Sequence, residues 1–62
     1  MTLKDLRELF YNGYDDKARI SLTTARDEIF EDIRINNSAL DPYNDRKVVG
    51  LADAMRLEVI IE

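Results

Sequence analysis

The chain has 62 residues and a formal net charge of −4, from 13 acidic and 9 basic side chains. It contains no cysteine and no histidine, which excludes disulfides, the usual zinc and iron–sulfur sites, and nucleophilic catalysis by cysteine or through histidine. Residues 1–31 carry seven acids and five bases, and residues 32–62 carry six acids and four bases. No concentrated basic patch is therefore expected for a nucleic-acid backbone.

The length and hydropathy of the chain indicate how many domains it forms and whether it enters a membrane. A chain of this size buries only about 60% of the surface that its unfolded form exposes, so we expect one marginally stable domain over residues 1–62. No apolar run approaches the roughly 18 residues that cross a membrane. Residues 1–5 lack the apolar run of a signal peptide. We therefore expect a soluble, cytoplasmic protein without membrane contact.

Residues 2–11 predict a helix. Thr2 is a suitable N-cap, and Asp5 follows three positions later, where a carboxylate favours the start of a helix. Apolar residues at helical spacing predict the stripe that docks on the rest of the protein: Leu3, Leu6, Leu9 and Phe10. The polar residues between them are expected to face water: Lys4, Arg7 and Glu8. The helix should end at Asn12 and Gly13, which tolerate a left-handed conformation.

Residues 17–23 follow an expected turn at residues 14–16 and alternate cleanly between apolar and polar. Ala18, Ile20 and Leu22 point one way, which predicts a half-buried antiparallel strand.

Residues 24–35 fit two patterns. As a helix, they begin at Thr24 and place Ala25, Ile29 and Ile33 on one face. As a strand, residues 28–35 place Ile29, Ile33 and Ile35 on one face, while Phe30 projects from the other. We favour the strand, because residues 33–35 are β-favouring and hairpins with short loops are common.

The remaining third of the chain predicts a loop and a hairpin. In the loop, residues 36–45, one helical turn at residues 38–40 would place Leu40 at the core edge, and residues 41–44 fit a type I turn. Residues 47–52 and 57–61 are short, β-branched runs around a polar break, which predicts two paired strands. Gly50 within the first strand indicates a bulge or a close approach by another backbone.

These elements predict an α+β fold, with one N-terminal helix packed on a three- or four-stranded antiparallel sheet. A single helix covers little of a sheet. Apolar surface that stays uncovered would mark a partner site or a homodimer interface.

Residues that could carry chemistry are few. Carboxylate pairs such as Asp27–Glu28 and Glu31–Asp32 could act in acid–base catalysis only inside a cleft, and a chain of this length has little room for one. The acids of residues 41–45 lack the alternating ligands and terminal glutamate of a calcium loop. The isolated glycines, Gly13 and Gly50, do not fit a phosphate-binding loop. We therefore expect a non-enzymatic protein without metal or cofactor.

The stretch of residues 27–32 is better suited to protein binding, because it places four acids around two apolar residues. It could dock on a basic groove with Phe30 as its anchor, and tyrosines such as Tyr43 are common at interaction hot spots. The predicted partner-binding residues are Asp27, Glu28, Phe30, Glu31, Asp32 and Tyr43. The alternative is that these acids form an ordinary solvated surface.

The order of parts resembles the very short α+β proteins encoded by bacteriophages and other bacterial mobile elements. Such proteins typically begin with Met-Thr, an aliphatic residue, Lys, an acidic residue and Leu, as residues 1–6 do here. They continue into a strand similar to residues 17–20 and end in two strands similar to residues 48–51 and 57–61. The resemblance implies an accessory role, and some proteins of this kind, anti-CRISPR proteins among them, inhibit host defence. No functional residue carries over, because no shared motif is available to match.

Two hypotheses follow for the function. The first is a small acidic protein-binding module, in its most specific form a phage-type inhibitor that covers a basic surface of a host nucleic-acid-processing or defence protein. The second is a structural or accessory protein that acts as a homodimer or larger homo-oligomer through its exposed sheet face or edge strand.

Overall fold

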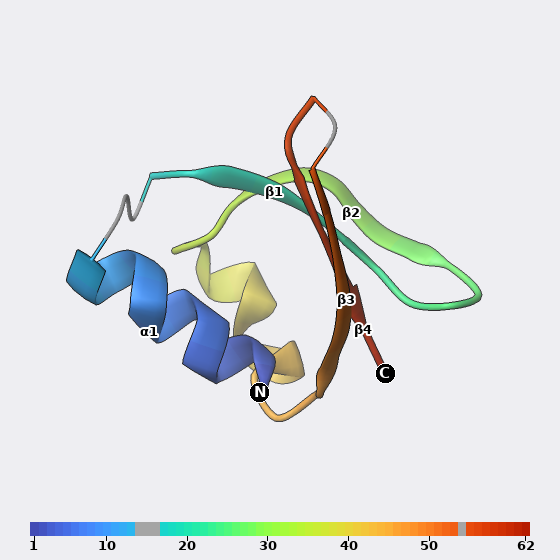
Figure 1. The fold of residues 1–62 in the computed structure, drawn as a ribbon, viewed down its shortest axis with the longest axis horizontal. Helices are drawn as coiled ribbons and strands as arrows, with labels where there is room; N and C mark the ends of the chain where they lie inside the picture. The colour runs from blue at the N-terminus through green and yellow to red at the C-terminus, as the bar shows by residue number, and fades with distance from the viewer. Residues whose placement is uncertain (14–16, 54) are drawn as a thin grey trace.

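The computed structural model describes residues 1–13, 17–53 and 55–62, and Figure 1 shows the path of the chain. The elements are helix α1 (Leu3–Gly13), strands β1 (Arg19–Thr23) and β2 (Glu28–Arg34), the 3₁₀ helix η1 (Ser38–Tyr43), and strands β3 (Val48–Asp53) and β4 (Leu57–Ile61). The helix and strands expected from the sequence are all present. The turn expected at residues 14–16 lies outside the described residues.

The four strands form one sheet in the order β2-β1-β4-β3. The predicted α+β class, with one N-terminal helix packed on a sheet, is confirmed. The β1–β2 and β3–β4 pairs are antiparallel as expected, whereas β1 and β4 run parallel, so the sheet is mixed. The two central positions belong to the strands with the most buried residues, β1 and β4. Strands β2 and β3 lie at opposite edges of the sheet. The segment that joins them, which contains η1, therefore crosses one face of the sheet (Figure 1).

The core lies between one face of the sheet and the layer formed by α1 and η1 (Figure 1). Its buried hydrophobic residues are Leu3, Leu6, Ile20, Leu22, Ile33, Ile35, Leu40, Val59 and Ile61. Alternation along the central strands supplies much of this set, since Leu22 of β1 lies beside Val59 of β4. Leu40, which the sequence places at the core edge, is fully buried as a member of the core.

Helix α1 begins as the sequence predicts. The Thr2 backbone N–H donates to Asp5 Oδ2 at 3.0 Å, and the Asp5 N–H donates to Thr2 Oγ1 at 3.2 Å, which forms a reciprocal capping box. The prediction for Arg7 was wrong, because this side chain is buried against η1 instead of facing water. Leu9 is 48% exposed, so the buried stripe follows Leu3, Leu6 and Arg7.

Residues 28–34 form a strand, which decides between the two patterns that the sequence allowed. The placement of Phe30 was wrong. Its partner in β1 is Leu22, and the partner of Ile33 is Ile20, with a register irregularity between the two pairs. The irregularity adds one residue to β2, so Phe30 and Ile33 both pack on the core side.

The β3–β4 hairpin contains the irregularity that Gly50 indicates. The register shifts between Val48 and Gly50, and a Cβ at position 50 would lie 3.1 Å from Ile60 Cδ1. The bulge is therefore confirmed, whereas the close neighbour of Gly50 is the Ile60 side chain and not another backbone. Before this point, Thr2 forms an isolated antiparallel bridge with Lys47, so the N-terminal residues run along the beginning of β3.

Candidate protein-binding surfaces

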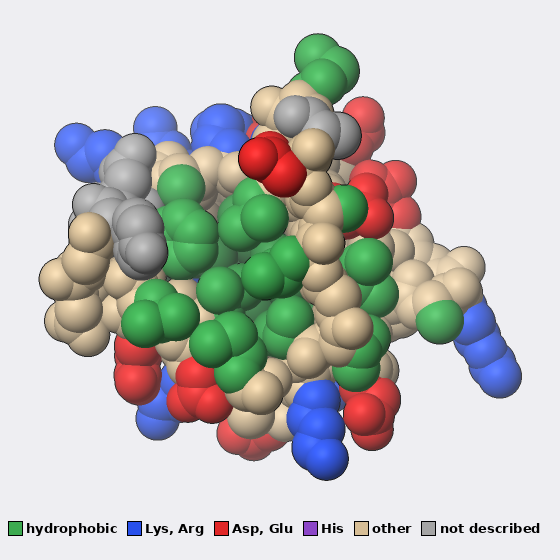
Figure 2. All heavy atoms as spheres, in the orientation of Figure 1, with side chains coloured by type: hydrophobic (Ala, Val, Ile, Leu, Met, Phe, Trp, Pro, Cys, Tyr) green, Lys and Arg blue, Asp and Glu red, His purple; other side chains and the backbone are tan. Residues whose placement is uncertain are grey.

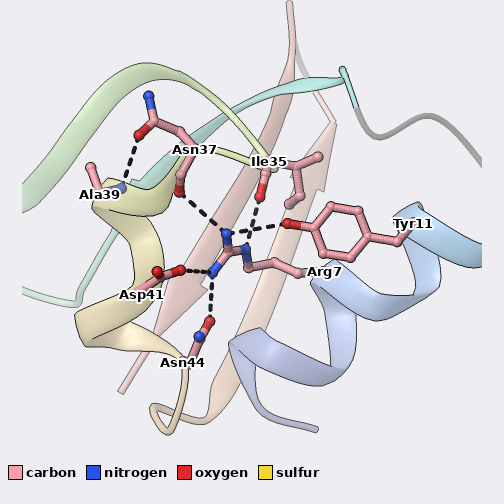
Figure 3. A network of polar contacts seen from close by, with 7 residues as sticks. All are labelled: Arg7, Tyr11, Ile35, Asn37, Ala39, Asp41 and Asn44. Atoms are coloured by element: carbon pink, nitrogen blue, oxygen red, sulfur yellow. Dashed lines mark hydrogen bonds and ion pairs between the residues drawn. The ribbon is translucent and has the colours of Figure 1, made fainter.

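Arg7 is the centre of the largest polar network in the described part of the chain (Figure 3). The residue is 5% exposed, and all five N–H groups of its guanidinium have acceptors. Nε donates to Ile35 O at 2.8 Å. Nη1 donates to Asp41 Oδ1 at 3.0 Å and Asn44 Oδ1 at 2.7 Å, and Nη2 donates to Asn37 O at 3.2 Å and Tyr11 Oη at 3.3 Å. The guanidinium keeps no donor for a ligand, so this network joins α1 to η1 and is not a binding site.

The outer face of the sheet, which faces away from α1, carries a shallow acidic hollow of about 260 Å³. Its lining residues are Ser21, Glu28, Glu31, Met55, Arg56 and Glu58. Alternation produces this arrangement, because Ser21 and Glu58 occupy neighbouring outward positions of β1 and β4. Glu28 and Glu31 come from β2, on the other side of β1.

Basic side chains neutralise one edge of this face. Asp32 Oδ1 accepts a hydrogen bond from Arg19 Nε at 2.7 Å and lies 3.7 Å from Arg56 Nε. The hydrogen bond from Arg19 lowers the pKa of Asp32 below its ordinary value of 3.8. Arg56 also donates from Nη1 to the backbone oxygen of Glu31 at 3.2 Å. Within the described residues, no ion pair reaches the carboxylates of Glu28, Glu31 or Glu58.

The structure divides the six partner-binding residues predicted from the sequence. Glu28 and Glu31 both line the acidic hollow. Asp32 lies next to the hollow, where it forms ion pairs with Arg19 and Arg56. Asp27 is exposed in the β1–β2 turn, where its backbone oxygen accepts from the Thr24 N–H at 2.7 Å.

The two aromatic residues of the predicted set lie on the core side of the sheet. The rings of Phe30 and Tyr43 meet edge to face, with centroids 6.2 Å apart, and both pack against the core. They are thus separated from the hollow by the sheet itself. Glu58 was missed, because only the parallel β1–β4 pairing brings it beside β1 and so within one strand of β2. Its outward position was visible in the alternation of residues 57–61.

A second surface is apolar. Figure 2 shows hydrophobic side chains gathered between α1 and the β3–β4 strands. Met1 is 56% exposed and lines two adjoining hollows, one against Leu9 of α1 and one against Val49 and Leu51 of β3. The single helix leaves this part of the sheet uncovered, as the sequence led us to expect.

Comparisons with protein-family models, with curated protein sequences and with solved structures returned no match. Among residues 1–13, 17–53 and 55–62, no group of three acidic side chains is arranged to hold a metal ion. In the same residues, no helix has the length and apolar character needed to cross a membrane.

Proposed function

We propose that the protein is a non-enzymatic binding module whose acidic outer sheet face docks on a basic surface of a larger protein. The observation that carries this proposal is the convergence of Glu28, Glu31 and Glu58 around one hollow. These three carboxylates outnumber the single basic side chain of the hollow, Arg56, so cationic groups of a partner would find acceptors there. Complementary charge of this kind speeds association and selects among partners.

The most specific form of the proposal is a phage-type inhibitor of a host nucleic-acid-processing or defence protein. Such targets carry basic grooves for phosphate backbones, and an acidic face could occupy one of them. The net charge of −4 and the small size of the chain support this form.

A capture experiment with three immobilised baits tests the proposal. The baits are the wild type, the double variant Glu28→Lys/Glu31→Lys, and the control Glu8→Lys/Asp45→Lys. The control makes the same change in net charge at exposed positions outside the acidic hollow. Asp32 is left unchanged, because its loss would leave Arg19 and Arg56 without their carboxylate.

We expect the wild type and the control to retain one basic protein from a lysate of the source cells, and the Glu28/Glu31 variant to lose it. Retention of the same protein by all three baits would contradict the proposal. Circular dichroism should show that the three baits are equally folded, since the changed side chains are exposed.

A further inference from the structure

The two edge strands of the sheet differ in how they are protected. Exposed edges invite pairing with other strands, and charged side chains usually prevent it. Edge strand β2 carries four charged residues, Glu28, Glu31, Asp32 and Arg34. Edge strand β3 has none between Val48 and Ala52, and its only charged residue is Asp53 at its end.

The N-terminal segment covers only the beginning of β3. Leu3 N–H donates to Arg46 O at 2.9 Å, and Val48 N–H donates to Met1 O at 2.8 Å. Beyond the bulge, Gly50–Asp53 pair regularly with β4 on one side. On their other side, no strand of the described chain follows β3.

The open part of this edge is apolar. Val49 is 59% exposed and Leu51 is 52% exposed, and they line one hollow together with Met1. A regular, uncharged edge with exposed aliphatic side chains has the properties of a pairing edge.

We infer that β3 pairs antiparallel with β3 of a second copy of this chain, across a two-fold axis at Leu51. The N-terminal segment blocks positions up to Val48, so a pair limited to residues 49–53 is centred on Leu51. Leu51 then faces Leu51 of the second copy, and Gly50 faces its Ala52. This arrangement joins two four-stranded sheets into one.

Charge favours a second copy as the occupant. The uncharged run begins after Lys47 and ends before Asp53. A two-fold antiparallel pair brings the beginning of one strand near the end of the other, so Lys47 of each copy lies towards Asp53 of its partner. Opposite charges near each other across strands stabilise such pairs. The contact is short, so we expect the dimer to be weak and reversible.

Single cysteine substitutions test the register, because the chain contains no cysteine of its own. Directly opposed residues of an antiparallel pair have Cα atoms about 4.5–5.5 Å apart, within the range that a disulfide bridges. Leu51→Cys should therefore form a disulfide-linked dimer under mild oxidation. Leu9→Cys, at a side chain of similar exposure on α1, and Val49→Cys, which faces Asp53 in this register, should stay mostly monomeric.

Sedimentation equilibrium of the unmodified protein, from micromolar to near-millimolar concentration, provides the second readout. We expect a reversible monomer–dimer equilibrium that Leu51→Lys weakens at least tenfold. A strict monomer, or equal cross-linking at all three cysteine positions, would overturn the inference. The test is independent of the acidic face, because Glu28→Lys/Glu31→Lys leaves β3 unchanged and should dimerise as the wild type does.

Discussion

At the scale of single residues, Arg7 explains how so short a chain holds its helix against the loop. Small domains often depend on a disulfide or a metal, and this chain has no cysteine or histidine to form one. Arg7 instead connects α1 with the backbone after β2 and with two side chains at η1. The sequence contained a signal for this burial: Arg7 lies four positions after Leu3 and three before Phe10, within the buried stripe.

We predict that Arg7→Ala lowers the free energy of unfolding by about 1–3 kcal/mol, because the buried backbone oxygen of Ile35 loses its donor while the remaining Asp41 carboxylate stays exposed to water. Arg7→Lys should restore only part of this loss, since a lysine ammonium cannot reproduce the planar five-donor geometry. Urea denaturation followed by circular dichroism measures both. Arg26→Ala, at an exposed arginine in the β1–β2 turn, is the matched control and should change little. A loss below about 1 kcal/mol for Arg7→Ala would contradict the structural role.

Asp32 provides a residue-scale test of the outer face. Its pKa is lowered chiefly by the hydrogen bond from Arg19. A carboxyl whose folded pKa is depressed contributes stability above its unfolded pKa, and that stability is lost as the pH falls through the folded value. The pH range in which Asp32 loses its contribution to stability therefore lies below about pH 4.

Titration of the Asp32 carboxyl carbon by NMR should give a midpoint below 3.8 in the wild type. Arg19→Gln should move that midpoint upward, because the glutamine amide is uncharged and shorter. Identical midpoints in the two proteins would show that the Arg19–Asp32 contact does not persist in solution.

At the scale of elements, local patterns predicted which segments form strands, and non-local pairing decided their partners. The alternation in residues 17–23 and 57–61 predicted the buried faces of β1 and β4, but it contains no information about parallel pairing between them. The sequence of β2 alone also did not predict its extra residue, because a bulge depends on the pairing with the partner strand. For this reason Phe30 lies on the core side, apart from the acids beside it in sequence.

Gly50 shows how one position couples the strands of the hairpin. We predict that Gly50→Val lowers the free energy of unfolding by about 1–3 kcal/mol, because the added methyl groups crowd Ile60. Gly50→Ala should cost less, since the end of the Ile60 side chain can rotate away. In a double-mutant cycle measured by urea denaturation, Ile60→Ala should reduce the cost of Gly50→Val. Additive effects would contradict the contact.

At the scale of the whole molecule, one helix and four strands leave two surfaces with different chemistry. The core side is apolar between α1 and β3, and the outer side gathers Glu28, Glu31 and Glu58. The sequence predicted uncovered apolar surface from the single helix. It predicted the acidic site only in part, because the hollow depends on β4 lying beside β1. We propose that the outer face binds a basic partner and that the β3 edge pairs with a second copy of the chain.

The most direct test of the central claim, recognition through the acidic face, is the affinity of the captured partner for the wild type and for Glu28→Lys/Glu31→Lys. Isothermal titration calorimetry at low and high salt measures both. We predict that the double variant binds at least about tenfold more weakly at low salt, and that salt weakens wild-type binding by screening the same charges. Equal affinities for the two proteins would contradict the account.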